Sequence, residues 1–393
     1  MRAAFKIVIG LMAVLGGIAP VEAAASVERE AAITVVGSRE TVFDWSHDAC
    51  ERTNIPDLPV RAFRDDRQRT QLLLSHFDNF RMIGASLADM HVDCRPVMRS
   101  GMDGTARRYD DREWLASIYT RDGKRIWALV HEEYQGHHHP GRCPSGRYLS
   151  CWYNAITLAR SDDGGRSYRH LRPPRHLVAS APYRYRPDMG TTGVFTPSNI
   201  VRRRDGAYYA LVRVRNPAGV RGTCLMRTRH IGDPRGWRGW TGARFGGVFI
   251  NPYRSAARPK PPCTPVGVGR IADMADSLTY NTFLDRYVLV GLADTPASSP
   301  GPKVSGIYFS TSRDLVDWTP RKLLLQAPRR QTYRCGDPLP IAYPSLIDPN
   351  SRSRTFATTG RRPFLYFTQL NYRDCRKSLD RDLIRVRVEI SAL

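Results

Sequence analysis

The chain has 393 residues and a formal net charge of +23 at pH 7, from 60 lysines and arginines against 37 aspartates and glutamates. Beyond the N-terminus no stretch has the roughly 20 apolar residues of a membrane-spanning helix, which argues against a helical membrane protein. Most of the basic residues are arginines, which form either a solvated surface or a site for an anionic partner. In an exported protein, an acidic polysaccharide or an envelope partner is favoured over a nucleic acid.

The first 25 residues have the pattern of a cleaved secretory signal. Arg2 and Lys6 precede an apolar segment at residues 7–18, and small residues follow it. We therefore expect residues 1–25 to be a signal peptide and residues 26–393 to be the mature domain, located in the periplasm or secreted.

Eight cysteines in an exported chain favour disulfide bonds over metal ligation, because no close Cys-x-x-Cys pair is present. The pattern leaves the connectivity open. The one local pairing that we predict is Cys143 with Cys151, which closes the loop after the sequence His131-Glu132-Glu133.

Residues 113–171 predict a β-meander. An apolar run leads into the Asp122-Gly123 turn, a second run ends at Glu133, and a third follows the long polar loop at residues 135–150. Asp-Gly between apolar runs is typical of antiparallel strands, and a long loop inside a compact repeat is usually functional or disordered.

The same pattern recurs and gives five units. In the third and fourth units the distance from the first turn to the aromatic residue after the third strand is almost equal, from Asp205 to Trp237 and from Asp285 to Trp318. Residues 33–45 are expected to close the ring as the outer strand of the last unit. Other expected strands are residues 60–64 and 70–76 in the first unit, 198–203, 208–214 and 224–228 in the third, 277–283, 287–292 and 306–310 in the fourth, and 343–347, 364–370 and 383–390 in the fifth.

Two turns resemble those of propeller enzymes. Residues 161–168 are similar to the Asp-box of sialidases, and residues 312–318 are similar to the matching turn of five-bladed propeller glycoside hydrolases, the arabinanase, xylosidase and invertase group. The resemblance implies an all-β, five-bladed β-propeller in a single domain, with a β-sandwich as the second interpretation. It argues for fold more than activity, because these turns are structural in those families. The matching residues are Ser161, Asp163, Gly165, Ser167, Tyr168, Ser312, Asp314, Leu315 and Trp318.

Polar side chains gather where first strands begin and second strands end, and these points share one rim of a meander. Glycoside cleavage needs two carboxyl groups, one protonated and one ionised. The resemblance implies that Asp57 is the first-blade base or nucleophile, and it matches the second blade loosely to Asp110 or Asp111. In the third blade, Ser198-Asn199 stands where the family commonly has its acid.

Glu133 is the expected substitute acid, because strand alternation places it on one face with His131. Glu132 points to the opposite face and is the second choice. Asp276 is expected to orient the substrate or to hold the pKa values of the active pair apart. The predicted catalytic residues are therefore Asp57, Glu133 and Asp276, and the predicted substrate-binding residues are Arg61, His131, Glu132, Asn199, Arg213 and Tyr343.

No cofactor or metal is expected. Consecutive imidazoles rarely point at one ion, so residues 137–139 predict an exposed loop tip, whereas Trp152 and Tyr153 are candidates for stacking on sugar rings. The sequence thus predicts a monomeric, exported enzyme similar to glycoside hydrolases, which acts on an oligosaccharide or polysaccharide. An acidic glycan is one interpretation of the many arginines. The alternative is a non-catalytic propeller that binds an acidic polysaccharide or envelope partner through its arginines.

Overall fold

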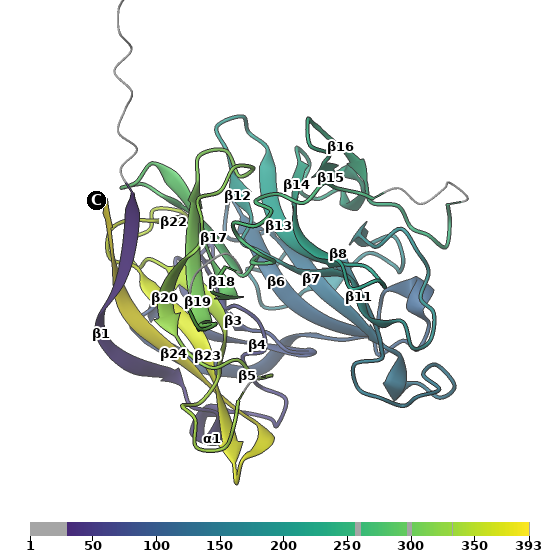
Figure 1. The fold of residues 1–393 in the computed structure, drawn as a ribbon, viewed down its shortest axis with the longest axis horizontal. Helices are drawn as coiled ribbons and strands as arrows, with labels where there is room; N and C mark the ends of the chain where they lie inside the picture. The colour runs from purple at the N-terminus through teal and green to yellow at the C-terminus, as the bar shows by residue number, and fades with distance from the viewer. Residues whose placement is uncertain (1–29, 256–260, 297–300, 332, 393) are drawn as a thin grey trace, which may run out of the picture.

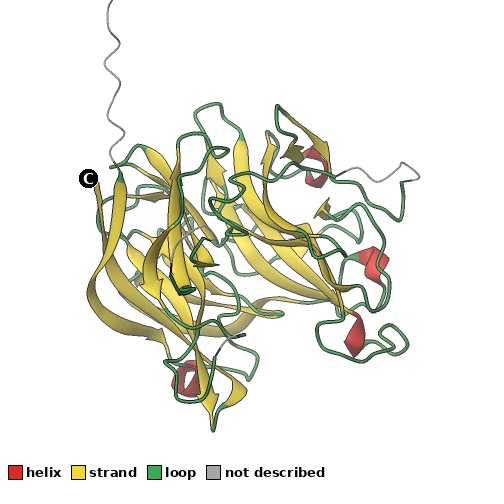
Figure 2. Ribbon diagram, viewed as in Figure 1, coloured by secondary structure: helices red, strands yellow, loops and turns green. Residues whose placement is uncertain are grey.

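The computed structural model describes residues 30–255, 261–296, 301–331 and 333–392. The expected signal peptide lies outside these ranges. Within them the chain is almost entirely β, with one four-residue helix, α1 (Trp45–Asp48), and a few short 3-10 turns (Figure 2). The all-β prediction is confirmed. Among these residues no helix is long and apolar enough to cross a membrane.

The first strand pairs with the last, as predicted for residues 33–45. Ala31 lies opposite Ala392 and Phe43 lies opposite Leu383 in an antiparallel ladder. Figure 1 shows this purple strand beside the yellow C-terminal strand, with strand order β1-β24-β23-β21 in the sheet. Its members are β1 (Ala31–Phe43), β21 (Ile341–Ile347), β23 (Phe364–Arg373) and β24 (Arg376–Ala392).

Two further sheets are separate meanders. Their strand orders are β2-β3-β4-β5 and β20-β19-β18-β17-β22, antiparallel except for the short β22, which runs parallel to β17. The first contains β2 (Arg61–Arg64), β3 (Thr70–Leu74), β4 (Asp78–Ser86) and β5 (Asp89–Arg99), and the second contains β17 (Ser277–Asn281), β18 (Arg286–Asp294), β19 (Ser305–Ser312), β20 (Lys322–Gln326) and β22 (Thr358–Thr359).

The fourth sheet has 11 strands and combines the second and third predicted units. Its path is β6-β7-β8-β11-β13-β14-β15-β16, with β9 and β10 on β8 and with β12 on β13. The strands are β6 (Arg112–Thr120), β7 (Ile126–Gln135), β8 (Cys151–Ser161), β9 (Arg169–His170), β10 (Leu177–Ala179), β11 (Gly190–Pro197), β12 (Val201–Arg202), β13 (Tyr208–Arg215), β14 (Arg221–Thr228), β15 (Arg238–Trp240) and β16 (Phe245–Val248).

Strand β11 is the reason that the described residues form four sheets rather than five. It runs parallel to β8 and antiparallel to β13, so it joins two units that were expected to be separate. The close approach requires Gly193, whose φ is +115° and where a Cβ would lie 2.1 Å from the main-chain oxygen of Asn154. The predicted strand at residues 198–203 is therefore only the end of a longer, broken one.

Apolar clusters fill the spaces between successive units instead of forming one central core. Phe63 of β2 lies in one cluster with Ile126 of β7. Phe80 of β4 lies in another with Tyr366 of β23, which joins the first unit to the last. Each unit thus buries its faces against its neighbours, which is the packing expected of a ring.

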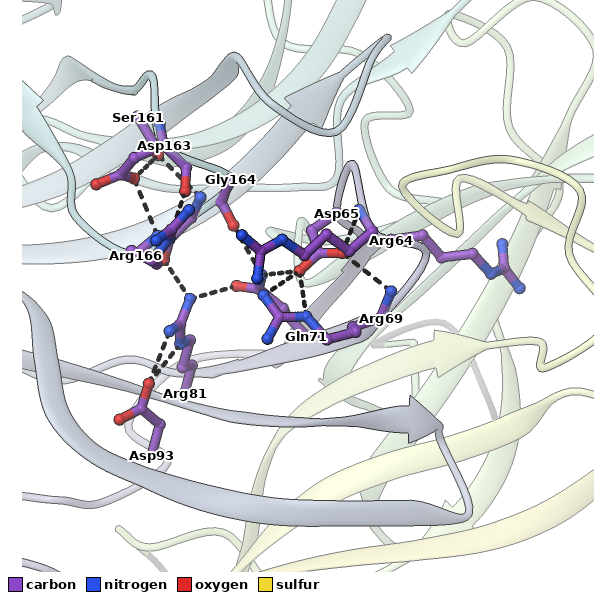
Figure 3. Close-up of polar contacts among 12 residues, drawn as sticks. Arg64, Asp65, Arg69, Gln71, Arg81, Asp93, Ser161, Asp163, Gly164 and Arg166 are labelled. Carbon is purple, nitrogen blue, oxygen red and sulfur yellow. Dashed lines mark hydrogen bonds and ion pairs between the residues drawn. The ribbon is translucent and has the colours of Figure 1, made fainter.

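The turn at residues 161–168 fastens neighbouring sheets together. Asp163 Oδ1 accepts a hydrogen bond from Ser161 Oγ at 2.7 Å, so the turn is shaped by its own side chains. Gln71 and Arg81, from β3 and β4, donate to the main-chain oxygens of its two glycines, each at 2.7 Å (Figure 3). These contacts give the turn a structural role.

Four disulfides pair all eight cysteines. The predicted bond between Cys143 and Cys151 is confirmed. Such bonds are compatible with an extracellular or periplasmic location. The other three are Cys50–Cys94, Cys224–Cys263 and Cys335–Cys375.

Candidate active site

Asp57 lies in the loop before β2, and three side chains from other parts of the chain hold its carboxylate. The Tyr343 hydroxyl donates to Oδ1 at 2.9 Å, the Arg381 guanidinium pairs with the same oxygen, and His76 Nε2 is 3.8 Å from Oδ2. Burial alone would raise the pKa of Asp57, but Arg381, then His76 and Tyr343, outweigh it and keep the pKa below its ordinary 3.8. An ionised carboxylate suits a base or a nucleophile.

An irregularity in β21 places Tyr343 against Asp57. The register with β23 shifts between Ala342 and Ser345, and Tyr343 itself has a φ of +56°. A residue other than glycine in this conformation costs on the order of 1 kcal/mol, and such strain is found at binding and catalytic sites. The side chain packs against the cluster that contains Trp114, near the start of β6.

Glu133, near the end of β7, forms a pair with His131, as strand alternation predicts. His131 Nε2 lies 2.9 Å from Glu133 Oε1, and Gln135 Nε2 donates to Oε2 at 2.6 Å. The Thr196 N–H donates to His131 Nδ1 at 3.2 Å, so Nδ1 is an acceptor and the ring proton is on Nε2. His131 therefore donates to Glu133, whose side chain is 13% exposed.

Asp57 and Glu133 act on the same neighbours. Burial raises the pKa of Tyr148, and the charges of both carboxylates raise it further. Burial lowers the pKa of His76, and both carboxylates oppose that shift. Groups that feel both charges lie near both acids. We call this set of residues the mouth; it consists of Asp57, His76, His131, Glu133, Tyr148, Arg330, Tyr343 and Arg381.

The loop after β7 supplies an aromatic edge to the mouth. Tyr148 is 49% exposed, and its ring lies 5.1 Å from that of Trp152 and 5.4 Å from that of His137, edge-on in both cases. The Cys143–Cys151 bond closes this loop. Exposed rings of this kind suit stacking on sugars. Tyr153, which was also expected to stack, is fully buried and is unavailable.

Asp276 precedes β17 and is only 2% exposed. Burial raises its pKa, and the nearby charge of Arg213 opposes the shift. Its Oδ2 accepts a long hydrogen bond from the Leu292 N–H at 3.4 Å. The pKa of Asp276 therefore moves opposite to that of Asp57, which fits the expected tuning role better than direct contact with substrate.

Arg61 does not line the mouth. It is 2% exposed, and its guanidinium donates to main-chain oxygens of Ala116, Pro197 and Asp276 and to the Ser345 hydroxyl, at 2.6–3.4 Å. Burial lowers its pKa to about 9. These acceptors come from four different units, so the geometry gives Arg61 a structural role where substrate binding was predicted.

Two other predicted binding residues also make internal contacts. Asn199 Oδ1 accepts the Leu278 N–H at 3.1 Å and links the third unit to β17. Glu132 is fully buried on the face of β7 opposite to Glu133, so it lies outside the mouth. Burial, with Asp111 and Glu113 nearby, raises its pKa well above the ordinary value.

The histidines at residues 137–139 do not converge. His139 pairs with Asp111 at 2.9 Å, whereas the rings of His137 and His138 contact each other at a tilt of 41°, with centroids 4.1 Å apart. Asp111 also accepts the Gln135 N–H at 2.9 Å, so it organises the loop after β7.

A cavity of about 680 Å³ lies at the opposite rim, among the turns after β12 and β17. Its carboxylates are engaged, because the Tyr209 hydroxyl donates to Asp205 at 2.6 Å and the Tyr280 hydroxyl donates to Asp285. The mouth, with the lowered pKa of Asp57 and the exposed Tyr148 ring, is the better candidate.

Sequence reasoning missed Arg381, Arg330 and Tyr148. Arg381 was placed outside the last predicted strand, and its contact with Asp57 joins residues 324 positions apart. The length of the loop at residues 135–150 indicated a functional segment, but nothing in the sequence distinguished Tyr148 from the other residues of that loop.

The sequence matches no family model and no curated protein. Several solved structures match the chain at low identity. A glycoside hydrolase matches with a TM-score of 0.48 and 12% identity, covering 90% of this chain and 92% of that one. RS223 β-xylosidase matches at 0.45 and 12%, covering 87% and 98%. An N-acetylgalactosamine deacetylase from F. plautii, in complex with blood group B trisaccharide, matches at 0.47 and 11%, covering 92% and 96%. At this level of similarity the comparisons assign neither substrate nor catalytic residues.

Proposed function

We propose that the chain is an exported glycoside hydrolase on a single-domain, five-bladed β-propeller, in which the 11-stranded sheet supplies two blades. The blade count is supported by the apolar clusters, which occur between successive predicted units and between the last unit and the first. Arg61 supports it too, because its hydrogen bonds reach the other four units.

The catalytic proposal is supported by the neighbours that Asp57 and Glu133 share, because the charges of both carboxylates act on His76 and on Tyr148. Asp57, held ionised by Arg381, would act as base or nucleophile at the anomeric carbon. The acid must reach the glycosidic oxygen, so geometry favours the partly exposed Glu133 over the buried Asp276. Asp276 would help to hold the pKa values of Asp57 and Glu133 apart without contacting the substrate.

The substrate that we propose is an oligosaccharide or polysaccharide with acidic groups. Arg330 lies close enough to Asp57 to help hold its pKa down, and it interacts with the Tyr148 hydroxyl as well. A sugar ring stacked on Tyr148 would place a carboxylate or sulfate near this guanidinium.

A second candidate function is non-catalytic binding of an acidic glycan. Arg381 neutralises Asp57, and Glu133 is held by His131 and Gln135. Carboxylates that are engaged in this way suit a site that binds a glycan without cleaving it.

The test is a glycan panel scored for binding and for release of reducing ends. We expect Asp57→Asn and Glu133→Gln each to lower turnover at least about a hundredfold without changing binding. Asp57→Asn should also lower the melting temperature, because it leaves Arg381 without its ion-pair partner. Glu40→Gln is the matched control, because Glu40 is exposed on β1. Wild-type activity that survives in both variants would overturn the assignment. Salt-sensitive binding without any product would establish the second function.

A further inference from the structure

A second cluster of ionisable side chains lies outside the mouth, where β9 and the turn before β10 cover the start of β6. It consists of Glu113, His170 and His176. One possible ligand atom from each lies within 4.8 Å of the other two. Glu113 and His176 are fully buried, and His170 is partly buried. Neither the fold nor the proposed glycosidase chemistry uses this cluster.

The state of His176 follows from its hydrogen bond. Nε2 lies 2.8 Å from the main-chain oxygen of Tyr109, and a carbonyl oxygen only accepts, so Nε2 carries the ring proton. Nδ1 therefore has a free lone pair, and this buried atom has no hydrogen-bond partner. A neutral imidazole with an unpartnered buried nitrogen is a ready metal ligand.

His170 is oriented in the same way. Its Nδ1 lies 2.8 Å from the main-chain oxygen of Leu171, which leaves Nε2 to face the carboxylates. Nε2 is 3.5 Å from Glu113 Oε2 and 3.3 Å from Asp110 Oδ1. The rings of His170 and His176 stack with centroids 4.4 Å apart. Metal-binding histidines typically give their second N–H to a carbonyl or carboxylate in this manner.

Apart from the ion pair with His170, the Glu113 carboxylate has no compensating partner. Glu113 lies directly opposite Glu132 in the β6–β7 ladder; both are fully buried, and none of their four oxygens has a hydrogen-bond partner. Like charges in this arrangement are unfavourable, and burial makes them more so. The adjacent Arg112 pairs with Asp111 at 3.0 Å, so it is engaged elsewhere.

We propose that Glu113, His170 and His176 bind a divalent metal ion, with Asp110 as the fourth ligand. Two imidazole nitrogens with carboxylate oxygens form a ligand set that suits Zn²⁺. The ion would neutralise the facing glutamates and fasten the outer segment, residues 169–179, to β6. Its role is structural, because the site is closed by burial. Nothing in the inference depends on the proposed glycosidase activity.

The test uses the tag-free mature chain, stripped with EDTA and titrated with Zn²⁺ by calorimetry. We expect one Zn²⁺ per chain and a rise in melting temperature on binding. His176→Gln and His170→Gln should each weaken binding at least about tenfold. His138→Gln is the matched control, since it removes a histidine from the exposed loop and should leave binding unchanged.

Co²⁺ gives a second readout that does not depend on stability. In the wild type its visible absorption should show tetrahedral nitrogen and oxygen ligands, and His176→Gln should abolish that spectrum. His170→Gln, at a partly exposed position, keeps the test available if His176→Gln does not fold. Absence of stoichiometric binding in the wild type, or binding lost only in His138→Gln, would overturn the proposal. In the first case the cluster is an ion pair of protonated His170 with Glu113.

Discussion

Asp57 depends for its charge on a residue that is distant in the sequence. Burial opposes ionisation, and the adjacent Arg381 guanidinium reverses the balance. Because the folded-state pKa is depressed, the carboxylate contributes stability above its unfolded value of about 3.9 and loses it as the pH falls through the folded pKa. The same ionisation sets when the proposed base is active.

Arg381→Gln should therefore shift the acid limb of the kcat/KM profile to higher pH. Removing the cation raises the pKa of Asp57, so the carboxylate protonates earlier as the pH falls. A pH–rate profile on a glycan that the wild type cleaves measures the shift. Arg376→Gln makes the same change of charge at an exposed position of β24 and should leave the limb where it is. An unmoved limb in Arg381→Gln would remove Arg381 from the account of Asp57.

Local sequence patterns predicted contacts within one strand but not contacts between segments that are far apart in the sequence. The pairing of His131 with Glu133 follows from the two-residue period of a strand, and the structure contains it. The approach of Arg381 to Asp57, or of His170 to Glu113, depends on how distant segments are brought together. No spacing in the sequence encodes either contact.

At the scale of elements, a disulfide bond restrains the loop after β7, which supplies Tyr148 to the mouth. The Cys143–Cys151 bond spans eight positions and encloses Tyr148. In the chain-entropy model a loop of this size is worth about 2–3 kcal/mol. Without the bond, Tyr148 would sample many positions, and ordering it would oppose sugar binding.

The double change Cys143→Ser with Cys151→Ser should lower stability and also weaken glycan binding. We expect KM to rise more than kcat falls, because the reacting carboxylates are on other elements. Denaturation and steady-state kinetics measure the two effects. Removing Cys224–Cys263, which lies away from the mouth, should lower stability alone. Equal KM values in the two double variants would show that the loop does not contact the sugar.

Strand β11 shows where element prediction fails. Its residues, 190–197, were assigned no strand, because the pattern of turns places the third unit at residue 198. The pairing with β8 needs a backbone contact that only Gly193 permits. In the sequence, Gly193 is the one residue that indicates this pairing, and a glycine at that position is equally typical of a turn.

For the whole molecule, Arg61 holds the units together at their centre. Arg61→Met would remove the Arg61 donor from the main-chain oxygens of Ala116, Pro197 and Asp276, of which Pro197 keeps a hydrogen bond from Ser117 Oγ. We expect a loss of at least about 3 kcal/mol in unfolding free energy. Urea denaturation measures it. Arg95→Met, where the side chain is 85% exposed, should change stability by no more than about 0.5 kcal/mol. Unchanged stability with lost glycan affinity would restore the substrate-binding role predicted from the sequence.

The global arrangement was more predictable than the site. Repeated meanders and the closing strand follow from periodicity, and β1 pairs with β24 as expected. The site residues were harder to predict, because Arg61 and Asn199 occur at rim positions in the sequence pattern but form hydrogen bonds that join units. Sequence alone does not distinguish a polar side chain that faces an opening from one that seals it.

The pairing of β1 with β24 also determines when folding can finish. The ribosome makes Ala31 before its partner Ala392, and about 360 residues lie between them, so the first strand stays unpaired while those residues are made. During that time Phe43 has no ladder to pack on, and an unpaired edge invites contact with other chains. The β1–β24 ladder can therefore form only after β24 has been synthesised.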